Sequence, residues 1–219
     1  MHESAVADRS GIAAGGNAGG VFDGEWRSRD GDGPQTPRRV YVTGMVIALS
    51  AIAMFFVAMV SAAVVREGAP SGDWQPLRAG TALWRILSLN TMMLVASSFT
   101  LAHSRSRARC GDSAGFGRWW LVTCALGVLF LAGQLLAWRH LVAAGLYLAT
   151  NPSSSFFYLI TAAHGVHLAA GIIALLVVAF RPARKIAQDT AVEVASMYWH
   201  AMDAIWIFLF LFLMFGGRA

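Results

Sequence analysis

The sequence predicts an all-α, polytopic membrane protein whose five transmembrane helices form a bundle. Hydrophobic residues make up 57% of the chain and charged residues 13%, about half the charged share of a typical soluble domain. Five apolar runs are each long enough to cross a hydrocarbon core roughly 30 Å thick; they cover about residues 42–65, 83–102, 119–138, 155–180 and 194–215. Because backbone groups in lipid must be satisfied within the segment, these runs are expected to be helices.

The basic residues argue against a nucleic-acid partner despite the formal net charge of +5. They lie in short clusters between the apolar runs, where topology signals occur. If all five runs cross, eleven basic residues near the membrane share the side of the N-terminus and five lie on the other side. This excess predicts an N-terminus in the cytoplasm and a C-terminus outside a bacterial-type cell (inner) membrane.

The chain opens with a polar segment, residues 1–39, that we expect to be a disordered cytoplasmic tail. It contains the Gly-rich stretch AAGGNAGG (13–20) and shows no apolar periodicity. It also lacks the apolar core and cleavage site of a signal peptide. The transmembrane domain is expected to cover residues 40–217. The two cysteines, Cys110 and Cys124, have no metal-binding or redox spacing.

The first three runs contain few polar residues, and these have structural interpretations. Small residues in the first run let neighbouring backbones approach closely; they include Gly44, Ser50, Ala51, Ala58 and Ser61. In the second run, Asn90 could hydrogen-bond across helices or form a packed polar spot. Trp119 and Trp138 bound the third run, as expected for an aromatic belt. A turn at Asn151-Pro152 precedes the fourth run.

The fourth and fifth runs carry ionisable residues well inside their apolar stretches, at His164, His167, Glu193, His200 and Asp203. Such residues in a membrane are functional or packing sites by default. At 100° per residue, His200 lies about 20° and Asp203 about 80° from Glu193 around a helix. The fifth helix is therefore predicted to carry one polar stripe that faces protein, a lipid headgroup or water.

Each of these residues has more than one interpretation. Thr190 and Glu193 have the spacing of a capping box that opens the fifth helix, and Glu193 could also contact the histidines or a lipid. His200 and Asp203 could form a satisfied pair that fixes helix packing, a proton relay, or a contact with lipid or another subunit. The two histidines of the fourth run could ligate haem, but the bulky aromatic residues around them argue against a cleared pocket.

The last two runs together resemble the end of subunit III of the heme–copper oxidases, the cytochrome c oxidase family. That family carries FFYLLT-x-x-HG-x-H on one helix and E-x-x-x-x-YWH-x-x-D-x-x-W-x-F on the next. The matching residues are Phe156, Phe157, Tyr158, Thr161, His164, Gly165, His167, Glu193, Tyr198, Trp199, His200, Asp203, Trp206 and Phe208. LNTMMLVASSFTLA (89–102) and AGQLLAW (132–138) are similar to further family phrases. The likeness covers about residues 40–217.

The resemblance implies a role without chemistry in this chain. Subunit III of the family carries no redox centre, packs on the catalytic subunit, holds lipids in a cleft and supports proton uptake and durability. The resemblance implies that the partners of this chain are catalytic subunit I, subunit II, a small subunit IV and membrane phospholipids. Haem and copper are then expected in the partner subunits, and catalytic, cofactor-binding and metal-binding residues are not expected here.

The resemblance also suggests how the polar residues are used. The five ionisable residues are expected to serve packing and lipid retention rather than the chemical step. The basic turn that follows the fourth helix could attract anionic headgroups at roughly 1 kcal/mol per residue; the candidates are Arg181, Arg184 and Lys185. The family's glutamate in S-E-x-x-x-F-F is replaced by Ala51, after Ser50, so its role does not carry over.

Several alternatives remain open from the sequence. The chain resembles the five-helix form of a family whose complete members have seven helices. Within the superfamily the same fold serves quinol oxidases and an accessory subunit linked to nitric oxide reductase, so the electron donor is not fixed. Outside the superfamily, the apolar runs would also suit a b-type haem protein or a small transporter.

Overall fold

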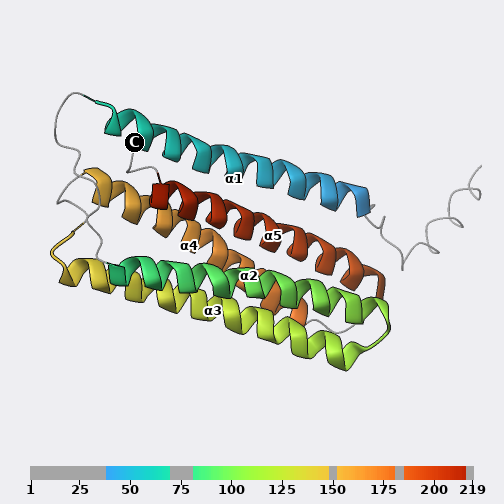
Figure 1. Ribbon diagram of the computed structural model, residues 1–219. Helices are drawn as coiled ribbons and strands as arrows, with labels where there is room; N and C mark the ends of the chain where they lie inside the picture. Colours follow the sequence, from blue (N-terminus) through green and yellow to red (C-terminus); the bar gives the residue numbers. More distant parts are fainter. Residues whose placement is uncertain (1–37, 70–80, 148–151, 181–184, 216–219) are drawn as a thin grey trace, which may run out of the picture. The chain divides into compact units, whose positions relative to one another are not determined.

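The structure, a computed structural model, describes residues 38–69, 81–147, 152–180 and 185–215, with side chains of the last segment from residue 190 onward. These segments form five helices (Figure 1), which are α1 (Arg38–Glu67), α2 (Thr81–Arg109), α3 (Ser113–Ala143), α4 (Pro152–Ala179) and α5 (Lys185–Phe215). All five are long and apolar enough to cross a membrane. The predicted fold class is therefore confirmed.

The helices extend beyond the apolar runs that predicted them. The 29 residues of α2 span about 44 Å at 1.5 Å per residue, which exceeds the roughly 30 Å of a hydrocarbon core. The additional turns can lie at the level of the lipid headgroups, where polar side chains add no free-energy cost to membrane insertion of the helix. Most of the predicted tail, residues 1–37, lies outside the described residues, and Arg38 and Arg39 form the first turn of α1.

Consecutive helices run antiparallel (Figure 1). The most extensive helix–helix contact joins α2 to α3, and α5 contacts α1, α2 and α4. The start of α1 lies at the same end as the end of α4 and the start of α5. We call this the Arg38 end, and the opposite one the Phe215 end.

Polar side chains fix the register of α2 against α3. The Asn90 side chain donates a hydrogen bond to the Phe130 carbonyl at 3.4 Å, which confirms bonding across helices. Asn90 also fills the space beside Gly133, where a Cβ would overlap its amide group. Nearer the Arg38 end, the hydroxyls of Thr100 and Thr123 lie 2.8 Å apart.

The turn between α2 and α3 ends on a capped helix start. The Asp112 side chain accepts a hydrogen bond from the Gly115 amide at 2.8 Å, and this bond is the main reason that the pKa of the Asp112 carboxyl is lowered. Arg107 approaches the same carboxyl at 3.3 Å. Gly111 has a φ of 76°, a conformation that glycine adopts without strain.

Large aromatic side chains fill the interior, and glycines make room for them. Trp199 is fully buried and lies against Gly127 of α3, where an added Cβ would come within 2.6 Å of the indole. On α4, a Cβ at Gly171 would meet the Tyr198 ring at 3.0 Å. Both glycines therefore let α5 approach its neighbours closely.

Candidate functional site

The ionisable residues of α4 and α5 lie in three different settings, and Glu193 is separate from the other four. One is a line of hydrogen bonds that joins α2 to α5, which we call the α2–α5 seam. In the seam the Trp199 indole donates to Ser97 Oγ at 3.0 Å, and the Trp206 indole donates to Thr91 Oγ1 at 3.0 Å. Ser98, the residue after Ser97, contacts His200 and Asp203, which lie between the two tryptophans along α5.

Ser98 joins His200 to Asp203. Its hydroxyl donates to Asp203 Oδ2, and its oxygen lies 3.0 Å from His200 Nδ1. Because a hydroxyl has one proton, donation to Asp203 leaves its oxygen to accept from a protonated Nδ1. The three side chains thus form one directed chain of hydrogen bonds, and the predicted pair is joined through a serine rather than by direct contact.

This chain of hydrogen bonds ends at Asp203. The Asp203 side chain is 4% exposed, and its second oxygen, Oδ1, has no hydrogen-bond partner within the described part of the protein. His200, at the other end, is partly exposed. A proton relay needs a path that continues on both sides, and the described helices continue it on neither. Within the described helices, these three side chains therefore hold α2 against α5.

The second setting is a group of rings around His164, which we call the ring cluster. His164 is fully buried, and its ring centroid lies 5.0 Å from Trp206, 6.0 Å from Phe130 and 6.1 Å from Phe56. Neither ring nitrogen has a hydrogen-bond partner among the described residues. His164 therefore packs as a flat aromatic side chain, between rings of α1, α3 and α5.

His167 lies at the edge of the same cluster. Its ring lies 5.6 Å from Phe56 and 6.3 Å from Phe55, and its Nδ1 lies 2.8 Å from the Ala163 carbonyl of its own helix. A haem would need a cleared face beside an axial histidine. The rings fill the space around His164, so the described helices leave no cleared face beside that ring.

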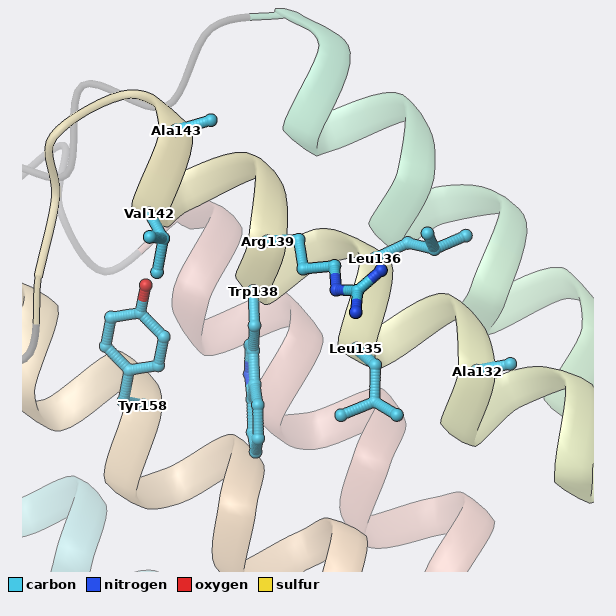
Figure 2. A pocket seen from close by; sticks show the side chains of 8 residues that line it. All are labelled: Ala132, Leu135, Leu136, Trp138, Arg139, Val142, Ala143 and Tyr158. Carbon is cyan, nitrogen blue, oxygen red and sulfur yellow. The ribbon is translucent and has the colours of Figure 1, made fainter.

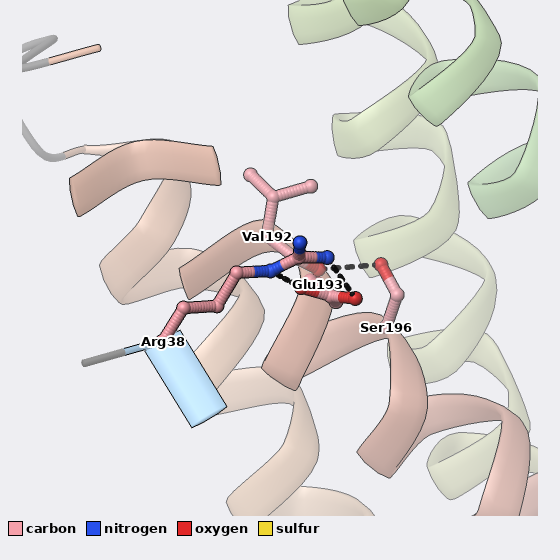
Figure 3. Close-up of polar contacts among 4 residues, drawn as sticks. All are labelled: Arg38, Val192, Glu193 and Ser196. Carbon is pink, nitrogen blue, oxygen red and sulfur yellow. Dashed lines mark hydrogen bonds and ion pairs between the residues drawn. The ribbon is translucent and has the colours of Figure 1, made fainter. Parts of the chain in front are cut away.

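Glu193 contacts α1 (Figure 3). Its carboxylate forms a bidentate pair with Arg38, with Nε at 2.7 Å and Nη2 at 2.6 Å. The predicted capping box is wrong, because α5 begins at Lys185 and Thr190 lies inside the helix. The Arg38 side chain is 68% exposed and that of Glu193 23% exposed, so the pair is one of the surface type.

The structure thus divides the predicted stripe. Glu193 contacts α1, whereas His200 and Asp203 contact α2. The sequence predicted no contact for Ser98 or for Arg38. The polar pair Ser97-Ser98 inside an apolar run was a usable signal for the seam. Nothing in the sequence pointed from Arg38 to Glu193, which are 155 positions apart.

A groove opens beside this ion pair at the Arg38 end. It has a volume of about 540 Å³ and lies among α1, α4 and α5. Alanines too small to fill the space form much of its wall; the lining residues are Tyr41, Met45, Ala170, Ala174, Val177, Val178, Thr190, Ala191, Val194, Ala195 and Tyr198. Of the predicted headgroup ligands, Arg181 and Arg184 lie outside the described residues, and Lys185 is described only as the first residue of α5.

Potential metal ligands do not cluster. No group of three or more His, Cys, Asp or Glu side chains within the described ranges could hold a metal ion. Of the two free cysteines, Cys110 is exposed and Cys124 is buried. The site therefore offers hydrogen bonds, one ion pair and an apolar groove.

Comparison with known proteins agrees with this architecture. The sequence profile of the family described as cytochrome c oxidase subunit III matches residues 30–218. A protein of Nocardia farcinica named probable cytochrome c oxidase subunit 3 is 36% identical over 172 residues, covering 76% of this chain and 83% of the relative. A Mycobacterium tuberculosis (strain H37Rv) protein of the same name is 33% identical over 175 residues, covering 78% and 86%. The cytochrome c oxidase subunit 3 of Synechocystis is 33% identical over 175 residues, covering 77% and 72%. The chain therefore belongs to the cytochrome c oxidase subunit III family.

Proposed function

We propose that this chain, an accessory subunit of a terminal oxidase, holds no redox centre and sustains the activity of the catalytic subunit by packing against it and retaining lipid. Membership of the family makes the chain part of a membrane-bound oxidoreductase complex that contains catalytic subunits. The observation that carries the proposal is the use of the ionisable residues. Those of α4 and α5 that the sequence singled out pack against neighbouring helices of the same chain.

This use of side chains favours a supporting role over chemistry. The Ser98–His200–Asp203 chain does not continue beyond Asp203 within the described helices, and rings surround His164. We therefore infer that haem and copper belong to partner subunits, namely catalytic subunit I and subunit II. A small subunit IV is a further proposed partner.

The groove at the Arg38 end supports lipid retention. Its volume and apolar wall suit an acyl chain. Arg38 lies one turn before the lining Tyr41, and its guanidinium has N–H donors beyond the two that pair with Glu193, which suit a phosphate. The basic bias of the sequence assigns this end to the cytoplasmic side of a bacterial-type cell membrane. The adjoining turn would add positive charge that attracts anionic headgroups there.

Filling the groove tests the proposal. Ala174 is exposed and lines the groove, so Ala174→Trp should displace an acyl chain without disturbing the core. Ala204→Trp is the matched control, because Ala204 is exposed on α5 and does not line the groove. Oxidase carrying each variant is purified in mild detergent. Phospholipid content, initial oxygen-reduction rate and the loss of activity over many turnovers are measured on the same preparations.

The two variants should separate durability from chemistry. We expect Ala174→Trp to keep the initial rate close to that of the unmodified oxidase, to lose bound phospholipid and to inactivate sooner. Ala204→Trp should match the unmodified oxidase in all three measurements. Unchanged lipid content and durability in Ala174→Trp would refute lipid retention at this groove. An immediate fall in rate with normal assembly and lipid would refute the supporting role.

A further inference from the structure

A second groove lies at the Phe215 end, between α3 and α4 (Figure 2). It has a volume of about 730 Å³ and an almost entirely carbon lining. In the view of Figure 2, Trp138 stands between Tyr158 and Leu135, and the Arg139 side chain extends toward Leu136. This groove shares no lining residue with the one near Arg38.

The aromatic wall of this groove is held in place by its own hydrogen bonds. The Trp138 indole donates to Thr161 Oγ1 at 3.1 Å, and the Tyr158 hydroxyl donates to the Leu146 carbonyl at 3.0 Å. The two rings meet edge to face with centroids 6.0 Å apart. Both polar groups are therefore engaged within the protein, and the rings present carbon to the groove. Such a preformed apolar surface suits an acyl chain.

Arg139 supplies the polar end of the site. It is exposed and lines the groove, and it forms no ion pair or hydrogen bond within the described segments. The 31 residues of α3 span about 46 Å, so a hydrocarbon core of roughly 30 Å centred on the helix ends near Trp138 and Arg139. The guanidinium therefore reaches headgroup level while its methylenes cover the groove.

The charge around the groove is positive. None of the described residues that line it is acidic. The antiparallel register set by Thr100 and Thr123 places Arg85 of α2 near the level of Trp138, and Arg85 is also exposed. A guanidinium can grip a phosphate with two hydrogen bonds. These features favour an anionic occupant with an apolar tail.

We propose that this groove binds an anionic phospholipid, with one acyl chain along Leu135, Trp138 and Tyr158 and the phosphate on Arg139. Because it lies at the Phe215 end, the lipid belongs to the leaflet opposite the one at the Arg38 end. The proposal does not depend on lipid at the other groove. The face of α3 and α4 would then be covered by lipid in the oxidase rather than by another subunit.

The test uses the complete oxidase and a photoactivatable lipid. Phosphatidylglycerol with a diazirine in its acyl chain is incorporated with the oxidase into nanodiscs and illuminated, and labelled peptides are quantified. Phosphatidylcholine with the same label is the zwitterionic comparison. Arg139→Gln removes the charge and Ala132→Trp fills the groove. Arg118→Gln and Ala125→Trp are matched controls on exposed positions of α3 outside the groove.

We expect phosphatidylglycerol to label residues 132–143 and Tyr158 more strongly than phosphatidylcholine does. Each test variant should lower this labelling at least about fivefold, as expected when a charge-assisted phosphate bond or its groove is removed, and neither control should change it. Equal labelling by both lipids, or labelling indifferent to Arg139→Gln and Ala132→Trp, would mean an ordinary boundary lipid and overturn the proposal. Displacement of the label by inorganic phosphate, or crosslinks from this groove to another subunit, would also overturn it.

Discussion

The α2–α5 seam and the ring cluster hold helices together in different ways. In the seam, indoles of α5 donate to hydroxyls of α2, and Ser98 joins His200 to Asp203. In the ring cluster, α1 meets α4 and α5 through rings and aliphatic side chains, with Phe56 and Val60 packed against Ile160 and Leu209. The described part of α1 buries only Phe56, Val60 and Ala63.

This difference indicates which contacts determine how the helices of the bundle pack. Lipid is as apolar as a leucine side chain, so burying apolar surface between helices adds little to the stability of their contact beyond van der Waals packing. A buried hydrogen bond is directional and costly to leave unmade, so the seam fixes how α5 sits against α2. Contacts in the ring cluster depend on the shape of the side chains and not on hydrogen-bond direction, so one ring should be replaceable by another of similar shape. The predictions below test this contrast, from the largest expected effect to the smallest.

Removing an indole from the seam should have the largest effect. Trp199→Ala removes a fully buried side chain and its hydrogen bond to Ser97, which we expect to destabilise the subunit by roughly 3 kcal/mol. The buried Cys124 thiol reports helix opening, so its alkylation rate is measured in purified oxidase with a Cys110→Ser background. That rate should rise about a hundredfold, since 1.4 kcal/mol corresponds to tenfold. The control, Trp119→Ala, removes an indole that is 37% exposed; equal acceleration by both would contradict the special role of the seam.

Removing the shared hydroxyl should have an intermediate effect. Ser98→Ala deprives Asp203 Oδ2 and His200 Nδ1 of their common partner, so the subunit should lose about 1–2 kcal/mol. The same thiol assay should show faster alkylation by roughly tenfold. Ser50→Ala is the control, because among the described residues that exposed hydroxyl bonds to the Val46 carbonyl of its own helix and to no other helix. A Ser98→Ala effect no larger than that of Ser50→Ala would show that the seam does not depend on this bond.

The ion pair between Arg38 and Glu193 should contribute less. Because both partners are partly exposed, their coupling energy should fall below about 1 kcal/mol and weaken further as salt is added. A double-mutant cycle of Arg38→Ala and Glu193→Ala measures it, with a thiol placed on the buried face of α1 by Ala63→Cys as reporter. A coupling above about 2 kcal/mol, or one insensitive to salt, would show that the pair is desolvated rather than exposed to solvent.

Exchange inside the ring cluster should have almost no effect on stability. His164→Phe keeps a flat ring between Phe56, Phe130 and Trp206 and removes two nitrogens that have no hydrogen-bond partner among the described residues. Replacing unpaired buried polar groups by apolar ones of similar shape is nearly neutral or stabilising, so the change should stay within about 1 kcal/mol. A loss as large as that of Ser98→Ala would mean that the His164 nitrogens have partners in the assembled oxidase.

The sequence was sufficient for the helices because the membrane imposes a length and a composition. All five apolar runs became helices, and their extra turns at the ends were missed because the prediction counted apolar residues only. For Asn90 the sequence left a cross-helix hydrogen bond and a packed polar spot open, and the structure shows the hydrogen bond. The capping box failed because Thr190 and Glu193 fit that pattern equally well inside a helix.

The sequence was sufficient to predict which residues compose the site, but not which helices they contact. Helical spacing places Glu193 and His200 about 20° apart around α5, yet they contact α1 and α2 respectively. Seven residues separate them by about 10 Å along the axis, and different neighbours can pass the same face at that distance. Which neighbour does so depends on how helices distant in sequence pack, and local periodicity contains no such information.

The central claim, that these polar residues support the oxidase rather than its chemistry, is tested most directly at His200. His200→Ala removes the partly exposed end of the only described chain of hydrogen bonds that joins ionisable groups of α5 to α2. The initial oxygen-reduction rate is measured on purified oxidase in which assembly and lipid content have been verified. Our account predicts a rate close to that of the unmodified oxidase, with activity declining sooner over many turnovers. An abolished initial rate with normal assembly and lipid would contradict it, because His200 would then lie on an obligatory proton path.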